Sequence, residues 1–275
     1  ERERCLFSVV GESCSEALLH LASAEKAGEP KKGRAADPVP VDLPMSLLFG
    51  NTPRMHREGL SRSRTYPDLD LDGVAVSEAL DRVLRLPAVA DKTFLVTIGD
   101  RSVGGQVVRD QMVGPWQVPV ADAGITTAGF DSHTGEAISM GERTPLALIN
   151  APASGRMAVT EAITNIACAG ISELSDIHLC ANWMAAAGEA GQDADLFKTV
   201  EAVTLDLCPA LGISIPVGKD SMSMSSRWNE NEDSFSVSSP LSLIVTAFAP
   251  VADVRRSATP VLDVSGSYRK MVAST

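Results

Sequence analysis

The residues best suited to bind a metal ion are Glu161 and Asn165, which lie four positions apart in a predicted helix. That spacing puts both side chains on one helix face, about one turn from each other. Carboxylate and amide oxygens are hard ligands of the kind that Mg²⁺ uses. Asp122 adds an acidic residue among small ones, where a ligand can approach closely. The alternative is that Glu161 and Asn165 are solvated helix residues and that Asp122 is a turn acid.

A second polar motif, Gly218-Lys-Asp-Ser221, combines backbone freedom, a cation, a carboxylate and a hydroxyl. These groups could hold a phosphate or a polar substrate. The motif is not a Walker A loop, because that pattern needs a second glycine at the position of Ile213. The alternative is the start of a strand, with Met222 and Met224 facing the core and the serines facing outward.

Nucleophilic catalysis has no support in the sequence. The 4 histidines and 5 cysteines are scattered, and no Ser-His-Asp, Cys-His or CxxC pattern stands out. Serine or thiol hydrolysis, a zinc site and a disulfide framework are therefore disfavoured. We assign no catalytic residue from sequence.

The charge balance limits the ligands that the chain can take. The 275 residues carry a net charge of −11. Residues 1–90 hold 12 basic and 14 acidic groups, and residues 91–275 hold 12 and 21. This acidity argues against nucleic acid and anionic membranes as partners. An anionic ligand must then be held by a few cations, backbone N–H groups or bridging metal ions. Since the chain begins with Glu1, we expect either a processed chain or a piece of a longer protein.

The elements that must position these residues are strands mixed with helices. The stretch 23–72 has the Gly, Pro and charge content of a linker, with one apolar segment at 41–50 that we expect to dock on a neighbour. The order of the other elements predicts an α+β fold with antiparallel neighbours. Predicted strands cover 5–10, 94–98, 103–113, 118–130, 145–149, 177–181, 213–217, 221–228 and 241–249, predicted helices cover 76–86, about 154–170 and about 194–211, and 229–233 is a predicted turn.

Six motifs, taken together and in this order, resemble the large single-chain form of phosphoribosylformylglycinamidine synthase. The resemblance runs from about residue 5 to 260. The motifs are Asp100-Arg-Ser-Val-Gly-Gly105, Gln111-Met-Val-Gly-Pro-Trp-Gln-Val-Pro-Val-Ala-Asp122, Gly141-Glu-Arg-Thr-Pro145, Glu161-Ala-Ile-Thr-Asn165, Ala181-Asn-Trp-Met-Ala-Ala-Ala-Gly188 and Gly218-Lys-Asp-Ser-Met-Ser-Met224.

The resemblance implies an organisation for the chain. Residues 1–14 would be the last strand of a first synthetase repeat, and 15–75 the connection between two repeats. Residues 76–254 would be the N-terminal lobe of the second repeat, and 255–275 a frayed tail. This lobe would have the mixed sheet of the aminoimidazole ribonucleotide synthetase N-terminal lobe, with helices on one face. In the family such lobes pair across a pseudo-twofold axis into a shared barrel.

The resemblance also implies a reaction and its cofactors. The family uses ATP, Mg²⁺ and glutamine-derived ammonia to convert formylglycinamide ribonucleotide into formylglycinamidine ribonucleotide, with an iminophosphate as the expected intermediate. In the second repeat, Asp122, Glu161 and Asn165 would be metal ligands at an auxiliary nucleotide site, and Lys92 a phosphate contact. Lys219, Asp220 and Ser221 would lie near the substrate cleft. The expected location is the cytoplasm, with no nucleic-acid or membrane partner.

Parts of the family pattern are missing from the sequence. There is no Gly-x-Cys-x-Gly elbow of a glutaminase, and the first repeat and the C-terminal lobe of the second repeat are absent. We therefore expect this piece to be inactive alone and to pair with the first repeat and the glutaminase of a full enzyme. One alternative is a non-catalytic pairing module. Another is a selenophosphate synthetase-like enzyme of the same superfold, which the long motifs disfavour.

Overall fold

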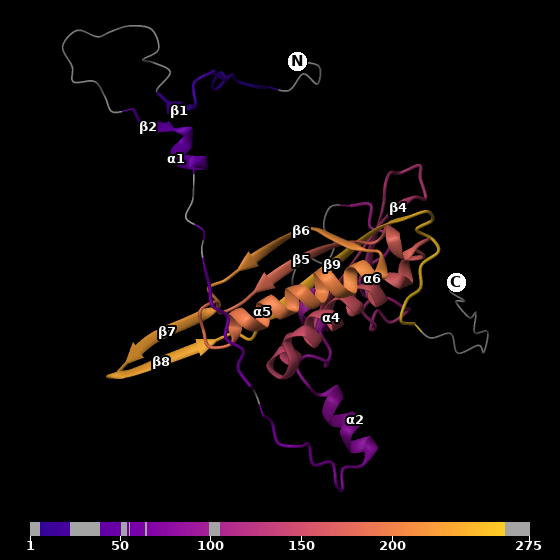
Figure 1. Cartoon of the computed structure of the whole chain (residues 1–275). Coiled ribbons are helices and arrows are strands. Elements are labelled where there is room, and N and C mark those ends of the chain that lie inside the picture. Colours follow the sequence, from indigo (N-terminus) through magenta and orange to yellow (C-terminus); the bar gives the residue numbers. More distant parts are fainter. Residues whose placement is uncertain are drawn as a thin grey trace, which may run out of the picture. The chain divides into compact units, whose positions relative to one another are not determined.

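The computed structural model describes residues 6–22, 39–50, 54, 56–63, 65–98 and 105–261, and it divides into two units, Glu1–Arg57 and Glu58–Thr275 (Figure 1). The strands are β1 (Leu18–Leu21), β2 (Val41–Pro44), β3 (Ala123–Thr127), β4 (Gly135–Glu142), β5 (His178–Met184), β6 (Ser214–Ser221), β7 (Ser225–Glu230), β8 (Asp233–Ser238) and β9 (Ser242–Val251). The helices are α1 (Met45–Phe49), α2 (Val76–Leu84), α3 (Thr93–Ile98), α4 (Ala147–Ile166), α5 (Gln192–Glu201) and α6 (Cys208–Leu211), the π-helical segment η5 (Ala202–Leu207) and the 3₁₀ turns η2 (Thr144–Leu146), η3 (Ala167–Ala169) and η4 (Leu174–Asp176). Over the described residues, no helix has the length and apolar character of a membrane span.

The first unit is a small hairpin followed by a short helix. Strand β1 pairs antiparallel with β2, and α1 follows directly. The strand predicted at 5–10 is wrong over its described part, because residues 6–10 have no regular structure. A strand needs a neighbour to satisfy its N–H and C=O groups, and in this unit β1 and β2 pair with each other instead. Cys5 and most of the predicted frayed tail, from residue 262 on, lie outside the described residues.

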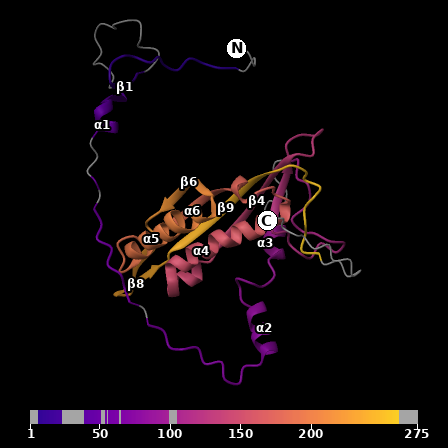
Figure 2. The same cartoon turned by 45° about the vertical axis from the view of Figure 1, so that its right-hand side comes forward.

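The second unit is built on a five-stranded mixed sheet. Its strand order is β3-β4-β9-β5-β6, with β5–β6 parallel and the other neighbours antiparallel. Helix α4 and the continuous run α5–η5–α6 lie over one face of this sheet (Figures 1 and 2). The expected α+β class, a mixed sheet with helices on one face, is therefore confirmed.

Helix α4 packs unusually close to strand β4. The strand turns four small buried residues toward the helix: Gly135, Ala137, Ser139 and Gly141. A Cβ at Gly141 would lie 2.1 Å from the carbonyl oxygen of Ala158, so only glycine fits there. The Ser139 hydroxyl donates to the carbonyl oxygen of Ala162 at 2.6 Å. The sequence prediction missed β4 because such small residues give little hydrophobic alternation.

The start of α4 also differs from the prediction. Asn150 has non-helical backbone angles (φ −151°, ψ 98°), and its Oδ1 accepts the N–H of Ala153 at 3.0 Å. The regular part of the helix thus begins after Asn150, a few residues before the predicted start. The strand predicted at 145–149 is wrong: these residues form η2 and the first turn of α4. Proline is tolerated in the first turn of a helix, so Pro145 does not require an extended chain.

Two further strand predictions are wrong. Residues 94–98 form helix α3, where Asp91 Oδ1 accepts the N–H of Thr93 at 2.9 Å and caps the first turn. This local hydrogen bond outweighs the β-propensity of the run. The described part of 103–113 contains only isolated bridges at Val107 and Met112. Residues 100–104 of the first motif lie outside the described residues, and only its last residue, Gly105, is described.

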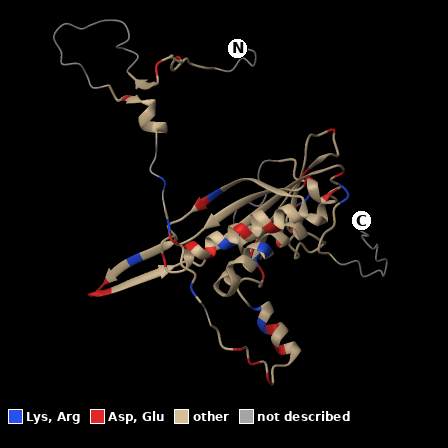
Figure 3. Cartoon of the chain, in the orientation of Figure 1, with Lys and Arg blue, Asp and Glu red and all other residues tan. Residues whose placement is uncertain are grey.

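Most of the remaining expectations for regular elements are confirmed. The predicted turn at 229–233 contains Asn231 and Glu232, both with positive φ, and it joins β7 to β8. Acidic residues gather at the tip of this hairpin (Figure 3). The confirmed segments are 76–86 (α2), 177–181 (β5), 194–211 (α5–η5–α6), 213–217 (β6), 221–228 (the end of β6 and most of β7) and 241–249 (β9). Of the run predicted at 118–130, only residues 123–127 form a strand, β3.

We predict that Gly141→Ala lowers the free energy of unfolding by about 1–3 kcal/mol, because the new methyl group collides with the backbone of α4. Urea denaturation followed by circular dichroism measures this. Gly129→Ala is the matched control, since a Cβ there meets nothing within 4 Å. Equal stability of the two variants would contradict the close β4–α4 contact.

Candidate functional site

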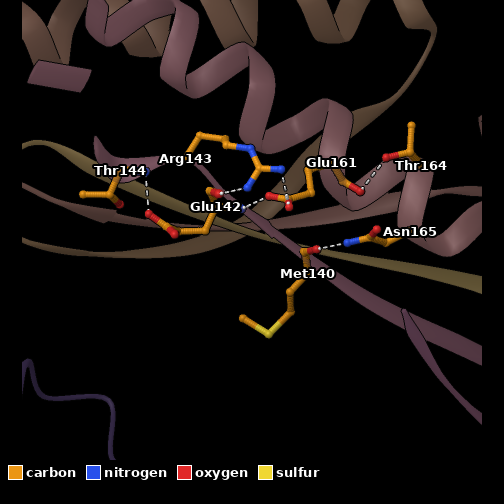
Figure 4. Close-up of polar contacts among 7 residues, drawn as sticks. All are labelled: Met140, Glu142, Arg143, Thr144, Glu161, Thr164 and Asn165. Atoms are coloured by element: carbon orange, nitrogen blue, oxygen red, sulfur yellow. Dashed lines mark hydrogen bonds and ion pairs between the residues drawn. The ribbon is translucent and has the colours of Figure 1, made fainter. Parts of the chain in front are cut away.

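Glu161 and Asn165 reach from α4 to the backbone of β4. Glu161 Oε2 accepts the N–H of Glu142 at 2.7 Å, and Asn165 Nδ2 donates to the carbonyl oxygen of Met140 at 2.8 Å (Figure 4). Strand β3 pairs with β4 only as far as Ser139. The two side chains therefore bond to strand groups that lie beyond the end of β3. The expectation that they share one helix face agrees with this arrangement.

Arg143 neutralises the Glu161 carboxylate. Its Nη2 lies 2.7 Å from Glu161 Oε1, and the side chains are 47% and 24% exposed. Its Nη1 also donates to the carbonyl oxygen of Glu142 at 3.2 Å. The backbone of Arg143 is anchored in turn, because the Ser154 hydroxyl donates to its carbonyl oxygen at 2.6 Å. Figure 4 shows the guanidinium between the two glutamates.

These side chains line an open hollow of about 290 Å³. Its lining residues are Arg143, Met157, Thr160, Glu161, Thr164 and Asn165. Since the nitrogen of Asn165 is committed to Met140, its Oδ1 is the atom that it can offer a metal ion. One carboxylate and one amide oxygen suit Mg²⁺, which commonly keeps several waters and takes one or two protein ligands together with phosphates. Over the described residues, no group of three or more His, Cys, Asp or Glu side chains could hold a metal ion. A metal ion in this hollow would therefore also need oxygen atoms from a bound small molecule.

Asp122 lies in a different hollow, of about 480 Å³, with Arg109 and Ile138. Met140 lines this hollow, and its carbonyl oxygen accepts the hydrogen bond from Asn165, which lines the hollow of Glu161. The pKa of the Cys168 thiol is raised, mainly by burial and to a smaller extent by the negative charge of Asp122. The structure thus brings Glu161 and Asn165 together and places Asp122 on the neighbouring surface.

The predicted phosphate contact Lys92 lies just before α3. Its ammonium donates to the carbonyl oxygen of Ala90 at 2.7 Å and to that of Pro87. Lys92 is not among the residues that line either hollow. The structure therefore places its charge on the carbonyl groups of the local backbone.

The Gly218–Ser221 motif forms the end of strand β6. Lys219 Nζ donates to Ser221 Oγ at 2.7 Å, and strand alternation puts Asp220 on the opposite face. A Cβ at Gly218 would lie 2.3 Å from the carbonyl oxygen of Ala181, so this glycine allows close pairing with β5. Asn182 is opposite Lys219 in the β5–β6 register. Its Oδ1 is buried without a hydrogen-bond partner among the described atoms.

Sequence reasoning missed the role of Arg143 and of the β4 backbone. The available signal is the motif Gly141-Glu-Arg-Thr-Pro145, which is part of the family resemblance. A single glycine, Gly141, lets the helix approach, and the adjacent residues bind its side chains. Such long-range pairing has no local pattern in the sequence.

Comparison with known proteins identifies the second unit. A family model described as "FGAR-AT PurM_N-like domain" matches residues 91–250, more than half of the chain. PurLQS from Thermotoga maritima is 17% identical with a TM-score of 0.48, over 82% of this chain and 32% of that one. Phosphoribosylformylglycinamidine synthase II of T. maritima is 16% identical (TM-score 0.48; 90% and 33%), and T. maritima PurL complexed with FGAR is 15% identical (TM-score 0.47; 89% and 32%). The chain spans about a third of the length of these solved proteins.

We predict that Glu161→Ala lowers the free energy of unfolding by about 1–2 kcal/mol, because it leaves the Glu142 N–H without its acceptor. Glu161→Gln keeps an acceptor and loses only a partly exposed ion pair, so its effect should stay below about 1 kcal/mol. Urea denaturation of both variants, with Glu136→Ala as control, separates the two effects. If Glu161→Ala were as stable as the wild type, the anchoring role of this side chain would be disproved.

Proposed function

This chain belongs to the FGAR-AT PurM_N-like domain family, and from that premise we propose that it is part of an ATP-dependent amidoligase of purine biosynthesis. The whole enzyme would convert formylglycinamide ribonucleotide, glutamine and ATP to formylglycinamidine ribonucleotide, ADP, phosphate and glutamate, in the cytoplasm. The chain would supply the N-terminal lobe of the second repeat of the large single-chain form. It would act together with the first repeat and the glutaminase domain, and would be inactive alone.

The observation that carries the proposal is the pair Glu161 and Asn165, fixed on β4 and open to a hollow in a domain of this family. The pair would hold Mg²⁺ for a nucleotide such as ATP or ADP at an auxiliary site. The bound metal would supply positive charge that joins acidic protein groups to phosphate oxygens. This suits a chain with a net charge of −11.

The other site residues have secondary places in the proposal. Asp122 would complete the metal ligands from the neighbouring hollow, and Lys92 would contact phosphate. Both assignments require these side chains to turn toward Glu161 from where the structure has them. Lys219, Asp220 and Ser221 would contact the ligand at the end of β6. No residue of this chain is assigned a catalytic role.

We predict that the 275-residue chain binds ADP in the presence of Mg²⁺ and that Glu161→Gln weakens this binding at least about tenfold, as the loss of a metal ligand should. Isothermal titration calorimetry with and without Mg²⁺ measures both. The control is Glu136→Gln, which removes one negative charge from β4 and should bind ADP as tightly as the wild type does. Metal-independent binding, or equal binding by all three proteins, would contradict the proposed site.

A second candidate function, a non-catalytic pairing module, is favoured by the sheet face opposite the helices. Ile138 and Phe248 are opposite each other in the β4–β9 register and are each 41% exposed. Met140, two residues further on the same face, is 55% exposed. Exposed apolar patches of this kind mark interaction sites. The occupant would be a second lobe of the same fold.

For the pairing module, sedimentation velocity without nucleotide should show self-association of the wild-type chain. Ile138→Glu should shift it to the monomer, because the charge would be buried in the interface. Leu205→Glu, at an exposed position on the helix layer, should associate normally. A monomeric wild-type chain at all concentrations would exclude self-pairing through this face.

A further inference from the structure

Arg143 is the one cation among the six described residues that line the Glu161 hollow. It uses Nη2 on Glu161 Oε1 and Nη1 on the carbonyl oxygen of Glu142. A guanidinium has five N–H donors in a planar fork that matches phosphate oxygens. Because 47% of the side chain is exposed, the remaining donors are within reach of a ligand in the hollow.

The backbone that carries Arg143 is held on both sides. Ser154 on α4 donates to its carbonyl oxygen at 2.6 Å. The next residue, Thr144, donates its N–H to the Glu142 carboxylate. The guanidinium can therefore change partners by side-chain rotation while its backbone stays in place.

We infer that Arg143 exchanges partners at this site, from the Glu161 carboxylate to the phosphate oxygens of a metal-bound nucleotide. A metal ion that binds Glu161 Oε1 competes with Arg143 for the same oxygen, since both are cations. Once the metal neutralises Glu161, the guanidinium turns to the phosphates, where charge-assisted and bidentate bonds are strong. This inference rests on the proposed nucleotide site and adds the residue that recognises its phosphate.

The exchange predicts opposite effects on two affinities. Removing the guanidinium frees Glu161, so the affinity for metal alone should rise by about two- to fivefold, the value of a partly exposed ion pair. The affinity for ADP at saturating metal should fall by about tenfold or more, because a hydrogen bond to a charged group is lost. A residue that merely held Glu161 in place would lower both affinities.

The test uses the full chain as wild type, Arg143→Gln, Arg143→Lys, Arg156→Gln and Glu161→Gln. Mn²⁺, which takes the same kind of oxygen ligands, is titrated alone by electron paramagnetic resonance, and ADP is titrated at saturating Mg²⁺ by calorimetry. We expect Arg143→Gln to bind Mn²⁺ more tightly and Mg–ADP more weakly. Arg143→Lys keeps the charge without the fork and should lie between this variant and the wild type. Arg156 is exposed on α4 and does not line the hollow, so Arg156→Gln should match the wild type.

Three results would overturn the inference. In one, Arg143→Gln lowers both affinities, which indicates a structural role. In another, it leaves both unchanged while Glu161→Gln still loses nucleotide, so that the proposed function survives and this inference alone fails. In the third, the wild type binds no Mg–ADP, and the proposed function and the inference fail together. Thermal unfolding of each variant confirms that the compared proteins are folded.

Discussion

The close approach of helix α4 to strand β4 is the contact on which the candidate site depends. Gly141 has no side chain, so the backbone of Ala158 can lie where a Cβ would otherwise be. At that distance the Ser139 hydroxyl reaches a helix carbonyl, and Glu161 and Asn165 reach the strand backbone. These hydrogen bonds satisfy backbone groups of β4 that lie beyond the end of β3, and they also hold the side chains of Glu161 and Asn165 in place.

Electrostatics then decides what the site can hold. Glu161 is compensated by one partly exposed guanidinium, which is a weak and exchangeable pairing. Under the proposed function, a divalent cation would join the acidic groups of this chain to phosphate oxygens. For this reason the proposal places a metal-bound nucleotide, and not a free anion, in the hollow. In that proposal Arg143 would be the group that changes partner when the metal ion and the nucleotide bind.

Prediction from sequence succeeded where the pattern was local. The apolar repeat of α4 placed Glu161 and Asn165 on one face, and the long apolar run of β9 identified a buried strand. It failed at β4, whose buried face is made of small residues, and at α3, where the Asp91 cap outweighs a β-prone run. It also could not place Asp122, because its hollow is formed by segments brought together by the sheet.

The sequence by itself determined the α+β class, the family motifs and the residue types that could bind a metal ion, because these follow from composition, periodicity and local spacing. Only the tertiary structure decided which of those residues share a hollow. It placed Asp122 in another hollow, left Lys92 out of the lining of both, kept Asn165 beside Glu161, and added Arg143 as the partner of the Glu161 carboxylate. The physical reason is that a site is defined by through-space distances of a few ångströms. Here those distances are set by the absence of one Cβ at Gly141 and by the point at which β3 ends.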